Sequence, residues 1–312
     1  MRAKRGCATV APVSRPLGTL VAALAVAASL LGASARSAAG GTAGAHAVDP
    51  ALFEPGSCIA FRPTVGHRHR TVFIDAGHGG PDPGAVGVTL GGRSVNEASL
   101  NVRVALDALT LLRRAGFRVV LSRTGAAAVA RPVPGDRSGG SFTGQGVHHD
   151  LIARDVCANR ARADILLGMY FDASSSAAVR GSLTLYDAVR GFAAANLRLA
   201  QLVQHDVLAR LALRGAGTLD AGVHTDVGFG SAVTNADRAY GHLLIIGPAK
   251  AGYFSSPSRM PGALIEPLFL TNPSDASIAD SVQGQRAIAA GLATAVERYF
   301  SLPTRERRRP AR

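Results

Sequence analysis

Histidine and carboxylate residues stand at the ends of apolar segments in this 312-residue chain. His78 follows the run Thr71-Val-Phe-Ile-Asp75 and lies between glycines, which allow the sharp turn that presents an imidazole. Glu97 begins an amphipathic segment, and Glu266 interrupts the apolar run from Ala263 to Leu270. Zinc accepts imidazole and carboxylate ligands, so these residue types indicate metal-assisted hydrolysis.

Two of these residues also have simpler interpretations. Alternatively, His78 is a loop histidine that caps the end of a strand. A carboxylate inside a buried strand needs a partner or a purpose, so the alternative for Glu266 is a salt bridge to a buried arginine. Beside a metal-bound water, desolvation would raise the pKa of Glu266 into the range where it accepts and returns a proton, which predicts a general base.

The apolar periodicity predicts strands and helices in alternation. Expected strands cover residues 72–75, 117–122, 165–173, 182–186, 243–246 and 263–270, and expected helices cover residues 97–115, 151–163, 196–213 and 285–299. This order predicts a single α/β domain with a largely parallel or mixed central sheet and helices on both faces. In such sheets ligands bind beyond the carboxyl ends of the strands, which would bring His78 and Glu97 together.

The ends of the chain differ in composition from its middle. Residues 1–35 combine basic positions, an apolar segment and the small residues Ala33-Ser-Ala35, which predicts a cleaved secretory signal peptide. An uncleaved membrane anchor is the alternative, but small residues dilute the apolar segment. We expect a flexible leader over residues 36–70, a catalytic domain over residues 71–300 and a basic, disordered tail over residues 301–312.

The charge of the chain limits its partners. A formal net charge of +13 suits an anionic cell wall and predicts a secreted, wall-associated protein with no stable membrane insertion after signal cleavage. Nucleic acid is the other usual partner of such charge. Tryptophan is absent, and there is no interleaving of aromatic and basic residues, so we expect no nucleic-acid partner.

Two cysteines remain once Cys7 leaves with the predicted signal peptide. Cys58 and Cys157 would then lie in an oxidising compartment, and two thiols are what one bridge needs. We predict a disulfide between the segment before the first expected strand and the helix expected from Leu151. Two unpaired buried thiols are the alternative.

Four blocks of this sequence resemble the zinc-dependent N-acetylmuramoyl-L-alanine amidases, which cleave peptidoglycan. The blocks are Ile74-Asp-x-Gly-His-Gly-Gly80, Asn96-Glu97, Arg154-x-x-x-Ala158-Asn159 and Leu264-Ile-Glu-Pro-Leu-Phe-Leu-Thr-Asn272. They occur in the family's order between about Thr71 and Tyr299. The resemblance implies a zinc cofactor held by His78 and Glu97, with Glu266 as the catalytic residue.

The third zinc ligand of that family has no equivalent here. The family's central strand carries Ser-Ile-His-x-Asn, and the aligned residues of this chain are Gly168-Met-Tyr-Phe-Asp172. Strand alternation would place Tyr170 and Asp172 on one face. We favour Asp172 as the third ligand, because Tyr170 would have to ionise from a pKa of about 10. A loop histidine is the remaining alternative: His148, His149 or, best placed, His224.

The expected reaction is hydrolysis of the amide bond between N-acetylmuramic acid and L-alanine by zinc-activated water, with Glu266 moving the proton. The missing histidine favours a different expectation, a catalytically impaired amidase-like protein that binds the cell wall or a wall partner without cleaving it. A metal hydrolase that acts on a different wall or peptide amide is a third expectation. The sequence lacks Gly-x-Ser-x-Gly, which argues against a serine hydrolase.

Overall fold

The computed structural model describes residues 44–228, 235–303 and 307. The predicted signal peptide, residues 1–35, and most of the predicted tail, residues 301–312, lie outside these ranges. Within the described ranges, no helix combines the length and the apolar character needed to cross a membrane.

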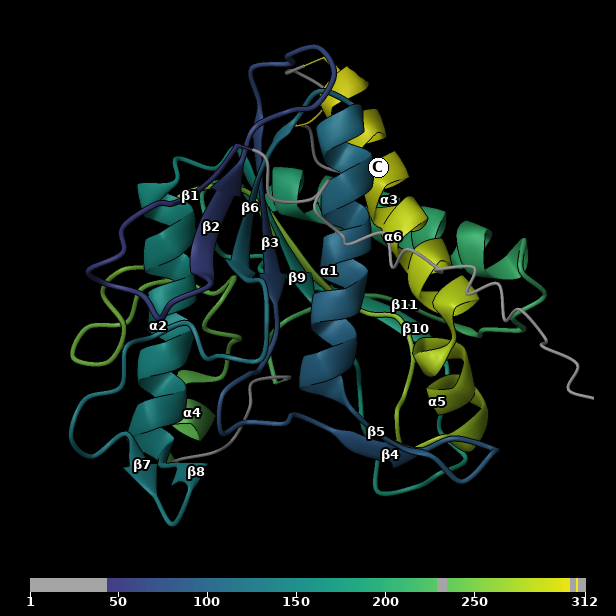
Figure 1. Ribbon diagram of the computed structural model, residues 1–312, viewed down its shortest axis with the longest axis horizontal. Coiled ribbons are helices and arrows are strands. Elements are labelled where there is room, and N and C mark those ends of the chain that lie inside the picture. Colours follow the sequence, from purple (N-terminus) through teal and green to yellow (C-terminus); the bar gives the residue numbers. More distant parts are fainter. Residues whose placement is uncertain (1–43, 229–234, 304–306, 308–312) are drawn as a thin grey trace, which may run out of the picture. The chain divides into compact units, whose positions relative to one another are not determined.

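An eight-stranded mixed sheet forms the centre of the domain, in the order β1-β2-β6-β3-β9-β12-β10-β11 (Figure 1). Its strands are β1 Ala45–Ala47, β2 Ser57–Phe61, β3 Thr71–Ala76, β6 Arg118–Arg123, β9 Ile165–Met169, β10 Ser182–Tyr186, β11 Asp220–Thr225 and β12 Gly262–Glu266. The central strands β6, β3, β9 and β12 are parallel, whereas β2 and β10 run antiparallel to them. Two hairpins lie outside this sheet: β4 Val86–Val88 with β5 Ser94–Asn96, and β7 Arg137–Ser138 with β8 Ser141–Phe142.

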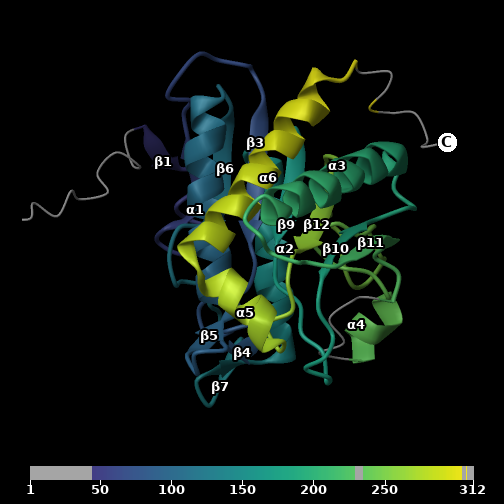
Figure 2. The same cartoon turned by 90° about the vertical axis from the view of Figure 1, so that its right-hand side faces the viewer.

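Helices cover both faces of the sheet (Figures 1 and 2). On one face lie α1 Glu97–Arg114, α3 Ala193–Ala212 and α6 Val282–Ser301, and on the other lies α2 Gly144–Arg160. Two shorter helices are α4 Asn235–Tyr240 and α5 Pro273–Asp280. The alternation of side chains along β3 explains both layers, because Val72 and Ile74 join the core on the α1 side and Phe73 joins the core on the α2 side. The predicted α/β class is confirmed.

The structure differs from the sequence prediction in several segments: α2 begins at Gly144, before the expected Leu151, and the strand expected over residues 263–270 ends at Glu266. The expected flexible leader, residues 36–70, contains β1 and β2, and β2 is largely buried and pairs with β6. Residues 243–246, expected as a strand, instead form a turn in which the amides of Ile246 and Gly247 donate to the carbonyl of Leu243. A run of four apolar residues is buried in either conformation, so its composition does not distinguish them.

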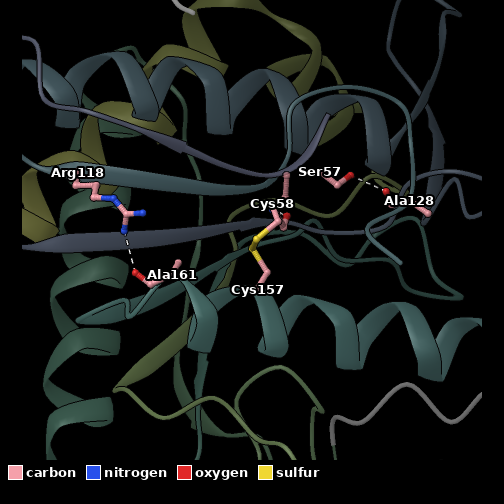
Figure 3. Close-up of a disulfide and its surroundings, with 8 residues drawn as sticks. Ser57, Cys58, Arg118, Ala128, Cys157 and Ala161 are labelled. Carbon is pink, nitrogen blue, oxygen red and sulfur yellow. Dashed lines mark hydrogen bonds between the residues drawn. A yellow bond between two sulfur atoms is a disulfide. The ribbon is translucent and has the colours of Figure 1, made fainter. Parts of the chain in front are cut away.

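Cys58 and Cys157 form a disulfide, as the sequence predicts, and join β2 to α2 (Figure 3). Both residues are fully buried, with their Cα atoms 5.7 Å apart and 99 positions apart in sequence. Closing a loop of this length restricts the unfolded chain and stabilises the fold by about 4–5 kcal/mol in the chain-entropy treatment. The bridge therefore anchors the segment that looked flexible in sequence.

Candidate active site

The carboxyl ends of β3, β9 and β12 meet at one edge of the sheet. Ala76 pairs with Met169, and Met169 pairs with Ile265, so the residues that follow them reach the same side. His78 comes two positions after β3, and Glu266 is the last residue of β12. The parallel register thus collects residues that lie far apart in sequence.

Glu97 is the first residue of α1 and faces His78. The Asn96 side chain caps this helix by accepting a hydrogen bond from the Ser99 amide at 3.0 Å, which fixes where α1 begins. Glu97 Oε2 lies 3.0 Å from His78 Nε2. The carboxylate is buried and accepts hydrogen bonds of 2.9 Å from the amides of Ala85 and Phe171. The first two predicted ligands are therefore in contact, and the backbone orients Glu97.

Asp82, to which the sequence analysis gave no role, contacts the other nitrogen of the His78 ring. Its Oδ2 lies 2.7 Å from Nδ1, and its Oδ1 accepts the Gly84 amide at 2.9 Å. Burial alone would lower the pKa of His78, but the hydrogen bonds and charges of Asp82 and Glu97 outweigh it and raise the pKa to about 9. Asp82 stands four residues after His78 in the sequence, and a metal-binding histidine commonly donates its second N–H to a nearby carboxylate, so this spacing could have indicated its role.

Glycines leave room for this arrangement. The ring of Tyr170 occupies the space that a Cβ atom would need at Gly77. A Cβ atom at Gly84 would lie 2.6 Å from Glu97 Oε2 and 2.7 Å from His78 Cδ2. The glycines around the histidine therefore allow close packing around its ring, beyond the turn that the sequence suggested.

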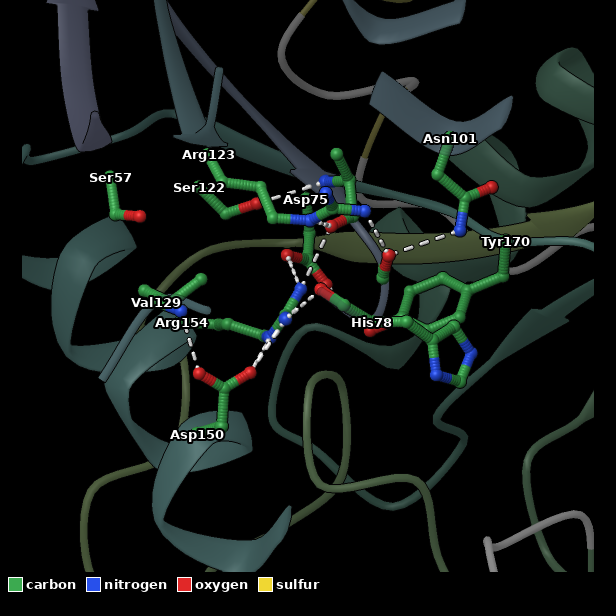
Figure 4. Close-up of polar contacts among 12 residues, drawn as sticks. Ser57, Asp75, His78, Asn101, Ser122, Arg123, Val129, Asp150, Arg154 and Tyr170 are labelled. Carbon is green, nitrogen blue, oxygen red and sulfur yellow. Dashed lines mark hydrogen bonds and ion pairs between the residues drawn. The ribbon is translucent and has the colours of Figure 1, made fainter. Parts of the chain in front are cut away.

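Behind the histidine, Arg154 on α2 fixes the loop (Figure 4). Its guanidinium donates to Asp75 Oδ1 at 2.7 Å, to Asp150 Oδ2 at 2.6 Å and to the carbonyl of His78 at 2.6 Å. Burial alone would lower the pKa of Arg154, but the charges of Asp75 and Asp150 raise it well above its usual value. Arg154 therefore stays charged and holds the backbone of the histidine in place.

A second buried arginine, Arg123 on β6, completes this support. It donates to the carbonyls of Ala76 at 2.8 Å, Gly77 at 2.6 Å and Ala98 at 2.6 Å, so it joins the histidine loop to the first turn of α1. Burial and the nearby charge of Arg154 lower its pKa to about 10. We call Asp75, Asp150, Arg154, Arg123 and Tyr170 the buried anchor.

Tyr170 belongs to the buried anchor through its hydroxyl group. That group donates to Asp75 Oδ2 at 2.7 Å, while the ring meets the His78 ring edge-on, with centroids 5.4 Å apart (Figure 4). Burial and the negative charge of Asp75 raise the pKa of Tyr170 well above its usual value. A neutral phenol already bonded to Asp75 is a poor metal ligand.

Asp172 and Glu266 share a hydrogen bond between their side chains. Burial raises the pKa of both carboxyl groups, and the charges of Asp172 and Glu97 raise the pKa of Glu266 further. A proton shared in this way is typical of two carboxylates held close together. We call His78, Glu97, Asp172 and Glu266 the reactive cluster.

The three loop histidines have other contacts. His224 lies in the edge strand β11, with Nε2 2.6 Å from the carbonyl of Ala221. His148 contacts the carbonyl of Tyr253 at 3.1 Å, and His149 contacts Asp136 at 2.9 Å. The structure does not bring these rings into the reactive cluster.

Two donors of the reactive cluster, His78 and Glu97, fit a zinc ion. The 3.0 Å between His78 Nε2 and Glu97 Oε2 is close to the distance between two ligand atoms that each lie about 2.0–2.2 Å from one ion. Glu97, Asp172 and Glu266 also concentrate negative charge that a cation would compensate. Asp172 as the third ligand stays a prediction. Within the described part of the chain, the group with three potential ligand atoms within 4.8 Å of one another is a different one, Asp187, Asp226 and His242.

A cavity of about 170 Å³ opens beside the histidine. It is lined by residues of the histidine loop, the β7–β8 hairpin, α2 and the residue after β9: His78, Asp82, Phe142, Val147, Asp150, Leu151, Arg154 and Tyr170. A larger hollow of about 590 Å³ lies between α3 and β11, away from these groups. We take the smaller cavity as part of the candidate site, because it contains the histidine and its carboxylate partner.

Comparisons with known proteins agree on one family. The family description N-acetylmuramoyl-L-alanine amidase matches residues 72–298. The amidase LytC of Bacillus subtilis (strain 168) is 32% identical over 216 residues, which cover 69% of this chain and 32% of LytC. The germination-specific N-acetylmuramoyl-L-alanine amidase of the same strain is 26% identical over 232 residues, which cover 74% of this chain and 80% of that protein. The chain thus spans about a third of the first relative and most of the second.

Solved structures share the fold. The CwlD amidase from Clostridioides difficile, in complex with the GerS lipoprotein, aligns with a TM-score of 0.55 at 19% identity over 74% of this chain and 98% of that one. The catalytic domain of CwlV, an N-acetylmuramoyl-L-alanine amidase from Bacillus (Paenibacillus) polymyxa var. colistinus, aligns with a TM-score of 0.51 at 21% identity. The alignment covers 75% of this chain and 99% of that one. At these identities the likeness concerns the fold alone.

Proposed function

Since this chain belongs to the N-acetylmuramoyl-L-alanine amidase family, we propose that it hydrolyses the amide bond between N-acetylmuramic acid and L-alanine in peptidoglycan. The observation that carries this proposal is the convergence of His78, Glu97 and Glu266 at one edge of the sheet. These are the three residues whose motifs match the family's metal-binding and catalytic blocks.

We propose zinc as the cofactor, held by His78 and Glu97 with Asp172 as the third ligand. Bound zinc would polarise the scissile carbonyl and lower the pKa of a water molecule. Asp82 lies 2.7 Å from Nδ1 of His78 and would keep the proton there in the neutral ring, which would leave the lone pair of Nε2 for the metal. The buried anchor keeps the histidine backbone in the position that this contact requires.

Glu266 is proposed to move the proton during hydrolysis. It must accept a proton from the attacking water and give one to the departing L-alanine nitrogen. Burial and the charges of Asp172 and Glu97 raise its pKa, which favours the protonated form that must give up the proton. Asp172 is hydrogen-bonded to Glu266 and keeps its carboxyl group oriented.

The proposed setting is extracytoplasmic and associated with the cell wall. The net charge of +13 favours an anionic polymer such as peptidoglycan as partner. The predicted signal peptide supports export, and neither stable membrane insertion after its cleavage nor nucleic-acid binding is expected.

A catalytically impaired protein that binds the wall without cleaving it is the alternative. Tyr170 favours it, because this residue stands at the family's third histidine and its hydroxyl is bonded to Asp75. On this alternative the carboxylates of the reactive cluster would serve in binding alone.

The test compares the purified protein, without the predicted signal peptide, with Glu266→Gln and Glu297→Gln. Zinc content is measured together with the release of stem peptides that begin with L-alanine from purified peptidoglycan. We expect Glu266→Gln to slow release by about 10²–10⁴-fold and to leave zinc content unchanged. Glu297 lies on the exposed side of α6, so its substitution should change neither quantity. A wild-type protein that binds peptidoglycan and releases no such peptides would support the alternative.

A further inference from the structure

We propose a second cation site, for a divalent transition metal such as zinc, formed by Asp187, Asp226 and His242. Asp187 directly follows β10, and Asp226 directly follows the parallel neighbour β11. The register pairs Tyr186 with Thr225, so the two aspartates emerge side by side. Strand β10 runs antiparallel to β12, which puts this group at the edge of the sheet opposite Glu266.

The three side chains lie within reach of one ion. His242 Nδ1 is 3.1 Å from Asp226 Oδ1, 3.2 Å from Asp226 Oδ2 and 3.3 Å from Asp187 Oδ2. Two ligands bound tetrahedrally to one zinc ion at about 2.0–2.2 Å lie about 3.3–3.6 Å apart. The observed separations are close to that range.

The carboxylate oxygens outnumber the donors available to them. The single Nδ1 nitrogen of His242 supplies at most one proton to three surrounding oxygens. Backbone amides satisfy Asp187 Oδ1 and reach Asp226 Oδ2: Val189 and Arg190 donate to the first, and Leu243 donates to the second. Asp187 Oδ2 is fully buried and has no hydrogen-bond partner, and it faces the imidazole of His242. A buried carboxylate oxygen of this kind needs a cation or a donor.

The neighbouring donors are directed elsewhere. The guanidinium of Arg190 donates to the carbonyls of Gly247 and Ser258, and the Tyr240 hydroxyl donates to the carbonyl of Pro248 at 2.7 Å. Asp155, also fully buried, adds a further carboxyl group next to Arg190 and Tyr240. The charge of Arg190 acts on Asp155 and Asp187 and offsets one of the three carboxyl groups, and a divalent cation would compensate the other two.

The donor set selects the class of metal. One imidazole with two carboxylates suits zinc and other first-row transition ions, whereas Mg²⁺ and Ca²⁺ prefer oxygen ligands throughout. The aspartates are fully buried, and the His242 side chain is 17% exposed, so the imidazole lies on the side open to solvent. A bound ion would join the ends of β10 and β11 to the segment after α4.

The experiment counts zinc in a protein whose candidate active site has been disabled. His78→Gln removes the only imidazole of the reactive cluster and so weakens zinc binding there, and zinc retained after equilibration with ZnCl₂ and removal of excess is then assigned by the second substitutions. Into this protein we introduce Asp187→Asn, which keeps the Oδ1 acceptor for Val189 and Arg190, and separately His242→Gln. The matched control is His224→Gln, a histidine two positions before Asp226 and outside the group.

We expect the His78→Gln protein to hold one zinc per chain and to melt at a higher temperature with zinc than with a chelator. Asp187→Asn and His242→Gln should each abolish both effects, and His224→Gln should abolish neither. A His78→Gln protein without bound zinc, or one whose zinc survives Asp187→Asn and His242→Gln, would overturn the proposal. If Asp187→Asn does not fold, His242→Gln decides alone. The readout does not involve amide hydrolysis, so it stands apart from the proposed function.

Discussion

The buried anchor and the reactive cluster meet at His78 but balance their charges in opposite ways. In the anchor, two carboxylates surround Arg154, and each of these contacts joins a donor to an acceptor. In the cluster, three carboxyl groups accompany one histidine: Glu97 contacts the His78 ring, and Glu266 is hydrogen-bonded to Asp172. His78 belongs to both regions, because its carbonyl is bound by Arg154 and its ring faces Glu97. The buried anchor, whose charges are paired, thus holds in position the reactive cluster, whose negative charges are not.

The largest effect should follow from removing the cation of the buried anchor. Arg154→Met leaves Asp75 and Asp150 as buried charges without a cation, and we expect a loss of about 3–5 kcal/mol in the free energy of unfolding. Urea denaturation measures this quantity. Arg160→Met on the same helix is the control: Arg160 is 58% exposed, and its ion pair with Asp49 should contribute less than about 0.5 kcal/mol. Equal effects from the two substitutions would contradict the distinction between anchor and surface.

The reactive cluster should be sensitive to pH in the metal-free protein. The pKa of His78 is raised to about 9, so its contribution to stability is complete below its unfolded value of 6.5 and is lost as the pH rises through about 9. The contribution amounts to no more than about 3 kcal/mol. Urea denaturation with a chelator at pH 6 and pH 10 should show a smaller difference for His78→Gln than for the wild type. An unchanged difference would show that His78 is not held as a cation.

Tyr170→Phe distinguishes an anchor residue from a metal ligand. The substitution removes the hydrogen bond to the buried Asp75, and we expect a loss of about 2 kcal/mol in the free energy of unfolding. Zinc content should stay the same, because the hydroxyl points to Asp75. Loss of zinc together with full stability would place Tyr170 in the reactive cluster instead.

Asp82→Asn should give the smallest effect on stability and a specific effect on the metal. The amide keeps the Oδ1 acceptor for Gly84 but offers a donor to His78 Nδ1, which favours the ring tautomer with its proton on Nε2. We expect zinc affinity to fall by about tenfold or more, measured by competition with a chromophoric chelator. Asp136→Asn is a matched carboxylate next to His149 and should leave the affinity unchanged. An unchanged affinity in Asp82→Asn would rule out Nε2 as the ligand atom.

The sequence predicted the parts of the site that lie in continuous motifs. His78, Glu97 and Glu266 each border a strand or helix, and parallel strands bring their carboxyl ends to one edge, so local patterns were enough. The role of Tyr170 was harder to predict, because the alternation of side chains along a strand predicts the face on which a residue lies but not the partner of its hydroxyl group. Asp82 lies two residues after the block that ends at Gly80, and only the ring contact reveals its role.

Segments whose structure depends on distant partners were not predictable. The five residues of β2 are ordered by pairing with β6 and by a disulfide to α2, neither of which a window around Cys58 contains. Residues 243–246 are buried as a turn, and four apolar residues carry no period. The group of Asp187, Asp226 and His242 comes from three separate segments, and no spacing in the sequence marks it.

The disulfide between β2 and α2 also sets an order in time. Cys157 is made 99 residues after Cys58, which at about 5–20 residues per second is an interval of about 5–20 s. The residues of β3, α1 and β6 are made during that interval, and Arg154 is made only near its end. Cys157 and Arg154, which holds the histidine loop, are therefore made together, three residues apart. The contacts around His78 cannot be completed before almost all of the chain that the disulfide joins has been made.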